Sequence, residues 1–191
     1  MPKIRILPLL LCLLLLTGCA GRDHAKKQDF LALRTQWLAA EQTELRAAVR
    51  ADYGDRIYDY VLRYSGSPSG GVITVEEPEM IAGVGVEIGE SGVTLYWDGA
   101  ELDTGAILGD FSPVQAFPLL LRCWQSGPVL ECWEETRDGV PCLAVELDLS
   151  EAGSADVRRC RTWFSVDDGR PTAAELSENG RTVLFVVFTA Q

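Results

Sequence analysis

The chain has 191 residues, of which 47% are hydrophobic, and its 28 acidic and 17 basic side chains give a formal net charge of −11. This length and apolar content are enough for one ordinary domain with a hydrophobic core. So acidic a chain offers no electrostatic footprint for nucleic acid, and anionic lipid head groups would repel it. Nucleic acid is therefore excluded as a partner, and attachment to a membrane requires something other than basic side chains.

The first segment is typical of a secretory signal. Lys3 and Arg5 precede an apolar run over residues 6–16, which is too short to span a bilayer because a spanning helix needs about 20 residues. Residues 16–19, Leu-Thr-Gly-Cys, resemble a bacterial lipobox. This resemblance implies diacylglyceryl transfer to the Cys19 thiol, cleavage before Cys19, and acylation of the new amino terminus, for example with palmitate. The alternative is an ordinary secretory signal with a chance cysteine.

The sequence therefore predicts a signal peptide over residues 1–18, then a lipidated cysteine and polar spacer over residues 19–28. Two or three acyl chains anchor a protein stably, whereas one is marginal. The expected location is extracytoplasmic, anchored by lipid to the cell membrane. In a host with an outer membrane, Ala20 after the anchor, rather than an aspartate, favours that membrane. His24, the one histidine of the chain, lies in the spacer and so cannot belong to a buried catalytic pair.

Residues 29–191 are predicted to form a single α+β domain. They open with an amphipathic helix, in which apolar side chains from Phe30 to Trp37 recur at helical spacing. A second helical segment is expected over residues 112–127, since it starts with a Ser-Pro pair and ends before Gly-Pro. Pro118 would shorten or kink this second helix.

Strand patterns with a period of two fill the rest of the domain. Four to six strands are expected before the second helical segment and five after it. Asp-Gly and Asn-Gly pairs separate several of them and suit tight turns with positive φ. Short connections make neighbouring strands antiparallel. The segments with strand patterns are residues 44–52, 56–64, 70–77, 83–89, 92–99, 128–136, 140–149, 157–166, 172–178 and 181–190.

Five segments of the sequence, which include predicted strands, turns and the second helical segment, resemble a known family. They are residues 51–66, 75–84, 95–105, 111–124 and 162–188. In their order and spacing they resemble the LolA/LolB/RseB-like bacterial lipoproteins, including the spore-germination branch. The resemblance implies a curved antiparallel half-barrel sheet wrapped around two helical segments. It also implies a carrier of lipoprotein acyl chains, an envelope sensor, or a partner of a germination amidase. Predicted lipidation, and the lack of a strongly basic sheet edge, set this chain apart from the soluble carrier.

The sequence nominates no catalytic residues, metal site or cofactor. Nucleophile-elbow, zinc-protease and P-loop motifs do not occur, and Asp167 and Asp168 precede Gly169 as in a turn. Acidic clusters lack the ligand spacing of calcium loops. The cysteines of the domain lack metal or redox spacing and are expected to be mostly free, although export also permits disulfides. These cysteines are Cys123, Cys132, Cys142 and Cys160.

Two binding surfaces are predicted. One is a patch of Arg159, Arg161 and Trp163, which point outward if the neighbouring Phe164 points inward. The other is the half-barrel cavity, lined by Tyr58, Tyr60, Leu62, Leu143, Val145 and Phe164. We therefore expect a non-catalytic, membrane-anchored binding module for an envelope partner protein, in germination or envelope regulation. The alternative is a carrier or acceptor of lipoprotein acyl chains or another hydrophobic ligand in the cavity.

Overall fold

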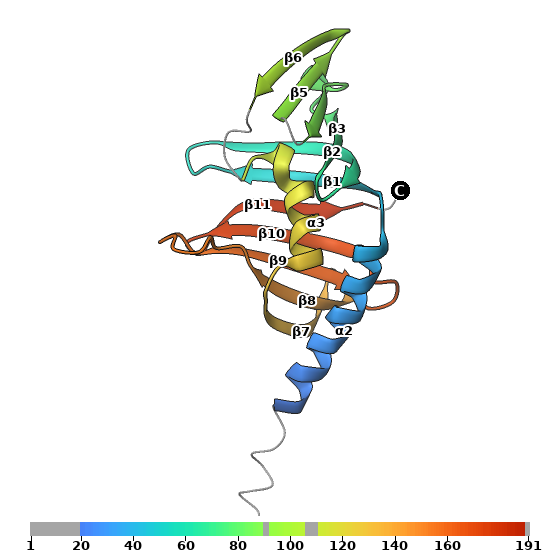
Figure 1. Cartoon of the computed structure of the whole chain (residues 1–191), viewed down its shortest axis with the longest axis vertical. Coiled ribbons are helices and arrows are strands. Elements are labelled where there is room, and N and C mark those ends of the chain that lie inside the picture. Colours follow the sequence, from blue (N-terminus) through green and yellow to red (C-terminus); the bar gives the residue numbers. More distant parts are fainter. Residues whose placement is uncertain (1–19, 90–91, 106–110, 190–191) are drawn as a thin grey trace, which may run out of the picture.

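The computed structural model describes residues 20–89, 92–105 and 111–189 (Figure 1). The predicted signal peptide and Cys19 lie outside the described residues. Among the residues that are described, no helix combines the length and apolar character needed to cross a membrane.

The fold is one antiparallel sheet of eleven strands in the order β6-β5-β4-β3-β2-β1-β11-β10-β9-β8-β7. Strands β1 to β6 extend outward from the centre on one side, and β7 to β11 return on the other. The first and last strands pair at the centre, with Val49 opposite Val186. The strands are β1 (Thr43–Asp52), β2 (Ile57–Ser67), β3 (Gly70–Glu77), β4 (Gly85–Gly89), β5 (Gly92–Trp97), β6 (Ala100–Gly105), β7 (Val129–Arg137), β8 (Val140–Asp148), β9 (Arg158–Ser165), β10 (Pro171–Glu178) and β11 (Arg181–Phe188).

The strands form where the sequence alternates apolar and polar side chains. In β1 every second residue is buried, beginning at Leu45, so one face of the sheet is apolar. The Asp98-Gly99, Asp138-Gly139 and Asn179-Gly180 pairs all have positive φ at both residues, which is the backbone of a two-residue hairpin turn. The ten segments predicted as strands and these three turns are confirmed, whereas β6 was not among the predicted segments; the six strands before α3 fall within the four to six expected, and five follow it as expected.

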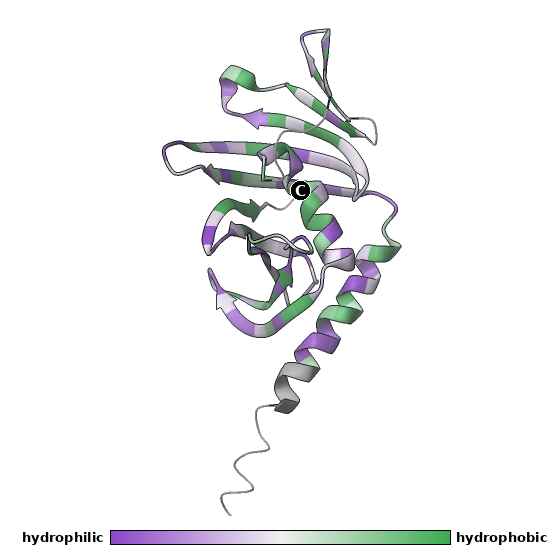
Figure 2. Ribbon diagram, turned by 60° about the vertical axis from the view of Figure 1, so that its left-hand side comes forward, coloured by the Kyte–Doolittle hydropathy of each residue, from purple (hydrophilic) through white to green (hydrophobic). Residues whose placement is uncertain are grey.

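Two helices, α2 (Ala20–Ala39) and α3 (Ala116–Ser126), pack on the apolar face of the sheet (Figure 1). The helix α2 contacts β7, β8 and α3, while α3 also contacts β2. In Figure 2 hydrophobic and hydrophilic bands alternate along α2, as expected for a helix with one face on the protein. Two single-turn 3₁₀ helices, η1 (Glu79–Ile81) and η2 (Pro113–Gln115), complete the chain.

One detail of the helices differs from the prediction. The helix α2 begins at Ala20, so the segment expected to be a polar spacer is helical. The second helical segment is shorter than residues 112–127, as expected from Pro118: α3 begins only at Ala116, after the 3₁₀ helix η2, and Pro118 lies in its first turn, where a backbone N–H has no partner within the helix to lose.

The two helices cap each other with polar side chains. The Arg34 guanidinium on α2 donates from Nε to the Trp124 carbonyl (2.8 Å) and from Nη2 to the Gly127 carbonyl (2.6 Å). In return Gln125 Nε2 donates to the Trp37 carbonyl (2.8 Å). The last carbonyls of a helix have no partner within it, and a cation there also complements the helix dipole. These bonds therefore fix α2 and α3 to each other as one unit.

Candidate binding groove

The six residues predicted to line a cavity lie on the concave side of the sheet, but the helices fill most of that side. Leu62, Val145 and Phe164 are buried. Tyr58 is 40% exposed and stacks on Tyr60, with ring centroids 6.3 Å apart. The structure therefore does not bring the six together around one open cavity.

Aromatic side chains from both helices occupy the hollow of the sheet. Phe30 lies 5.9 Å from Phe164 and Trp124 lies 5.4 Å from it, measured between ring centroids. Trp37 packs 4.8 Å from Trp124. The Trp124 indole N–H donates to the buried hydroxyl of Thr162 (2.9 Å), so a polar contact also fixes α3 to β9. This part of the half-barrel is a packed core.

One open groove, of about 620 Å³, lies between α2 and the turn that joins β9 to β10. We call it the α2 groove. It includes two of the predicted cavity residues, Leu143 and Phe164, at its floor. The apolar floor residues are Ala32, Leu33, Leu143 and Phe164, and the charged rim residues are Lys26, Asp29, Glu134, Asp167 and Asp168.

The rim of the α2 groove is acidic. Lys26 Nζ pairs with Glu134 and lies 3.5 Å from Asp29 Oδ2; the hydrogen bond to Glu134 is the main cause that raises the pKa of Lys26. The Arg170 backbone N–H donates to Asp168 Oδ1 (3.0 Å), which lowers the pKa of that carboxyl group. The groove therefore presents four carboxylates and one cation, which is already engaged.

The width of the α2 groove is set where the β9–β10 turn touches α2. Gly169 has φ of +68°, and a Cβ at this position would lie 2.7 Å from Leu33 Cδ1. A side chain there would strain the backbone, and the Leu33 side chain would have to shift to admit it. A second hollow of about 580 Å³ lies across this turn and shares Ser165 and Asp168 with the groove.

The predicted patch on the convex face is not an exposed aromatic surface. Trp163 points away from Phe164, as predicted, but it is only 4% exposed. The Arg137 guanidinium covers it, 4.3 Å from its ring centroid and 5.1 Å from that of Phe185. Glu135 accepts a hydrogen bond from the Trp163 indole N–H. The expectation of an exposed Trp163 is therefore wrong, because a long cationic side chain from β7 packs over the ring.

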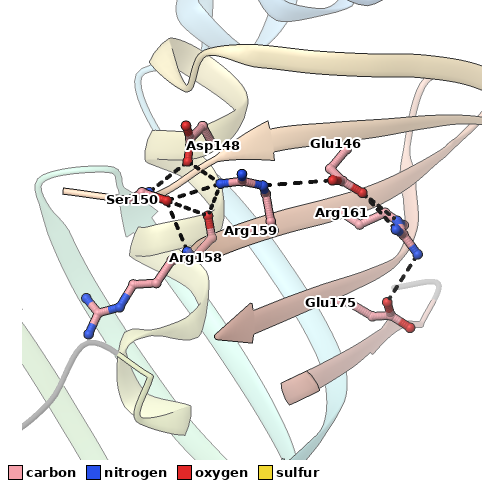
Figure 3. Close-up of polar contacts among 7 residues, drawn as sticks. All are labelled: Glu146, Asp148, Ser150, Arg158, Arg159, Arg161 and Glu175. Carbon is pink, nitrogen blue, oxygen red and sulfur yellow. Dashed lines mark hydrogen bonds and ion pairs between the residues drawn. The ribbon is translucent and has the colours of Figure 1, made fainter. Parts of the chain in front are cut away.

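The arginines of the predicted patch are paired with carboxylates of neighbouring strands (Figure 3). Arg159 Nη1 lies 2.6 Å from Asp148 Oδ1. Arg161 lies between Glu146 (2.7 Å) and Glu175 (3.8 Å), which stand opposite it on β8 and β10. The hydrogen bond with Glu146 raises the pKa of Arg161. Carboxylates of the domain itself therefore already pair with both arginines of the predicted patch.

The four cysteines of the domain are buried, free thiols. Cys132 faces the main core and Cys142 the opposite face of the sheet. A hydrogen bond with Cys160, together with burial, raises the pKa of the Cys123 thiol. Within the described residues, no group of three or more His, Cys, Asp or Glu side chains is placed to hold a metal ion.

No family model matches the chain, and no curated protein matches it. The chain is similar in fold to a LolA superfamily protein from Nitrosomonas europaea, at 10% identity over 85% of this chain and 91% of that one (TM-score 0.45). It is also similar to the lipoprotein LppX of Mycobacterium tuberculosis, at 13% identity over 84% and 92% of the two chains (TM-score 0.43).

A third structure is that of the CwlD amidase of Clostridioides difficile in complex with the GerS lipoprotein, at 13% identity over 86% and 93% (TM-score 0.39). The solved structures to which this chain is similar thus include a LolA superfamily protein and lipoproteins, the group that the sequence resembles. The likeness is remote in sequence, so a ligand or partner has to be inferred from this chain's own residues.

Proposed function

We propose that this protein is a lipid-anchored, non-catalytic docking module that binds an envelope protein through the α2 groove. The packing of the half-barrel interior carries the proposal. Phe30, Trp124 and Phe164 are completely buried there, and the two helices that pack against the sheet are fixed to each other by Arg34 and Gln125. Because the described residues fill the hollow in this way, we infer that the protein acts through its surface.

A protein partner fits the α2 groove better than an acyl chain does. The floor is apolar, but five charged side chains surround it. An acyl chain lying across such a rim would remove water from these charges and offer them no hydrogen bond, which is costly. A protein segment can cover the floor and pair with the rim at the same time.

The alternative function, carriage of an acyl chain or another hydrophobic ligand, has one observation in its favour. Leu33 on α2 and Leu143 on β8 form part of an apolar floor that is open to one side, and pockets of a few hundred Å³ commonly hold small apolar ligands.

Site-specific photocrosslinking of the intact lipoprotein in its own host separates the two functions. A photoreactive phenylalanine analogue replaces Gln36, which lines the groove, or its exposed neighbour Thr35, which does not. Docking predicts a protein adduct of discrete mass from position 36 and none from position 35. Lipid adducts alone at position 36, with stoichiometric lipid in native mass spectra, would support carriage instead.

The lipid anchor is a separate part of the proposal. The helix α2 starts at Ala20, immediately after the cysteine of the lipobox. We expect Cys19→Ala to move the protein from the membrane fraction to the soluble fraction or to leave its signal uncleaved. Mass spectrometry of the amino-terminal peptide should show acyl chains on Cys19 of the unmodified sequence. An unmodified thiol at that residue would contradict the anchor.

A further inference from the structure

We propose that the occupant of the α2 groove is a cationic amphipathic segment of the partner, with apolar side chains flanked by lysine or arginine. This inference rests on the proposed docking function, because it names the chemistry of the partner at the same groove. It follows from three properties of the groove: its rim is negatively charged, its floor is apolar, and the rim directly borders the floor.

The rim carries more negative charge than its own cation satisfies. Lys26 engages Asp29 and Glu134. Asp168 lies 3.7 Å from Arg170, in a pair that is largely exposed, and such pairs contribute little. Asp167 is exposed and has no ion-pair partner among the described residues. The rim therefore adds a local acidic surface to a chain that is already at −11, and it attracts cations.

The floor requires an apolar group at the same place. The apolar surface that is still open comes from α2, where Ala32 is exposed and Leu33 is half-buried, while the buried Leu143 and Phe164 close the base from the sheet. A ligand that covers Ala32 and Leu33 removes their apolar surface from water. Because Gly169 holds the turn against Leu33, the groove is already formed before a ligand binds, which lowers the cost of ordering the site.

Simpler ligands satisfy only half of the groove. A polyamine would pair with the carboxylates and leave the floor in water. An acyl chain would cover the floor and strip water from the rim. A helix or extended segment with both kinds of side chain satisfies both, as in the recognition of amphipathic segments in apolar grooves elsewhere.

The test uses the intact lipoprotein in nanodiscs of zwitterionic lipid, with empty nanodiscs as the blank. Three labelled twelve-residue peptides are compared by fluorescence anisotropy: one of Lys and Leu, one of Glu and Leu, and one of Lys and Ser. We expect the Lys/Leu peptide to bind at least tenfold more tightly than the other two, and to weaken as salt is raised from 50 to 500 mM because added ions screen the rim. Equal binding of the Glu/Leu or Lys/Ser peptide would overturn the proposal.

Charge reversal at the rim of the groove provides a second test of the proposal. Asp29→Lys with Asp167→Lys should weaken the Lys/Leu peptide about tenfold or more, since two attractions become repulsions. The matched control, Asp55→Lys with Glu79→Lys, makes the same change of charge at two exposed positions outside the groove and should alter affinity less than twofold. Equal losses in the two double variants would overturn a site at the groove.

The two proposals fail in different ways. All four reversed acids are exposed, so both double variants should keep the unfolding temperature of the parent protein. A protein adduct at position 36 that persists in Asp29→Lys with Asp167→Lys would leave docking intact and overturn the cationic segment. No protein adduct at position 36 in the parent protein would overturn docking itself.

Discussion

The buried hydrogen bond from Trp124 to Thr162 joins α3 to β9. Replacing Thr162 with valine measures the contribution of this bond to the free energy of unfolding. The two groups are 2.9 Å apart and both residues are fully buried. Valine keeps the shape of threonine but leaves the indole N–H without an acceptor, which costs about 1–3 kcal/mol. For a chain of this length, that loss lowers the unfolding temperature by about 2–12 °C.

The assay is thermal unfolding of Thr162→Val followed by circular dichroism, with Thr182→Val as the matched control. Thr182 is exposed on β11, so the same change there should stay within about 0.5 kcal/mol of the parent protein. A double-mutant cycle with Trp124→Phe should give a coupling energy of about 1 kcal/mol, because each single variant breaks the same bond. An undiminished unfolding temperature, or a coupling energy near zero, would refute the reasoning.

Three further predictions concern the groove, the thiols and the convex face. Gly169→Ala should destabilise the domain by about 1–2 kcal/mol in urea titrations, because φ is +68° and the new Cβ meets Leu33; an unchanged midpoint would argue against the close contact. Cys123 should resist iodoacetamide at pH 8 until the protein is denatured, as peptide mapping would show, since the thiol is buried with a raised pKa; rapid native labelling would contradict this. Indole hydrogen bonds, from Trp133 first and then Trp163, lower the pKa of Glu135. Its contribution to stability is therefore complete above the unfolded value of about 4.3 and lost as pH falls through the lower folded value. Glu135→Gln should reduce the loss of unfolding free energy at acid pH. A pH dependence of the unfolding free energy identical to that of the parent protein would contradict this role of Glu135.

Much of the fold follows from local patterns. The alternation in β1 and the positive φ of Asp138-Gly139 are properties of short segments, so the strands and turns could be placed without tertiary information. The pairing of β1 with β11, with Val49 opposite Val186, joins residues far apart in the chain. No local signal in the sequence specifies that pairing, and it was not predicted.

The rest depends on contacts that a linear pattern does not show. The segment before Phe30 is polar and looked like a spacer, yet it continues the helix, and Lys26 within it reaches Glu134 on β7. In β6 the acidic residues beside Leu102 weakened the strand pattern, so Ala100–Gly105 was missed as a strand of its own.

The sequence contains a signal for the burial of Trp163. Its partners in the two neighbouring strands are Ala144 and Ala173, whose small side chains leave room for the indole to lie flat on the sheet. Arg137 then covers the ring from β7. Small residues opposite a tryptophan therefore argued for a packed aromatic side chain instead of a free one.

The start of α2 at Ala20 has a consequence for how the domain stands on a membrane. Ten residues separate Ala20 from the buried Phe30, a helical rise of about 15 Å. With acyl chains on the preceding residue, this rigid stem would hold the β7 end of the sheet toward the bilayer and direct β5 and β6 away from it (Figure 1). The exposed Trp97 and Leu102 on those two strands would then face outward, at the far tip of the molecule. A rigid helix of this kind would restrict the distance of the domain from the bilayer and its orientation relative to it. A flexible tether would restrict neither.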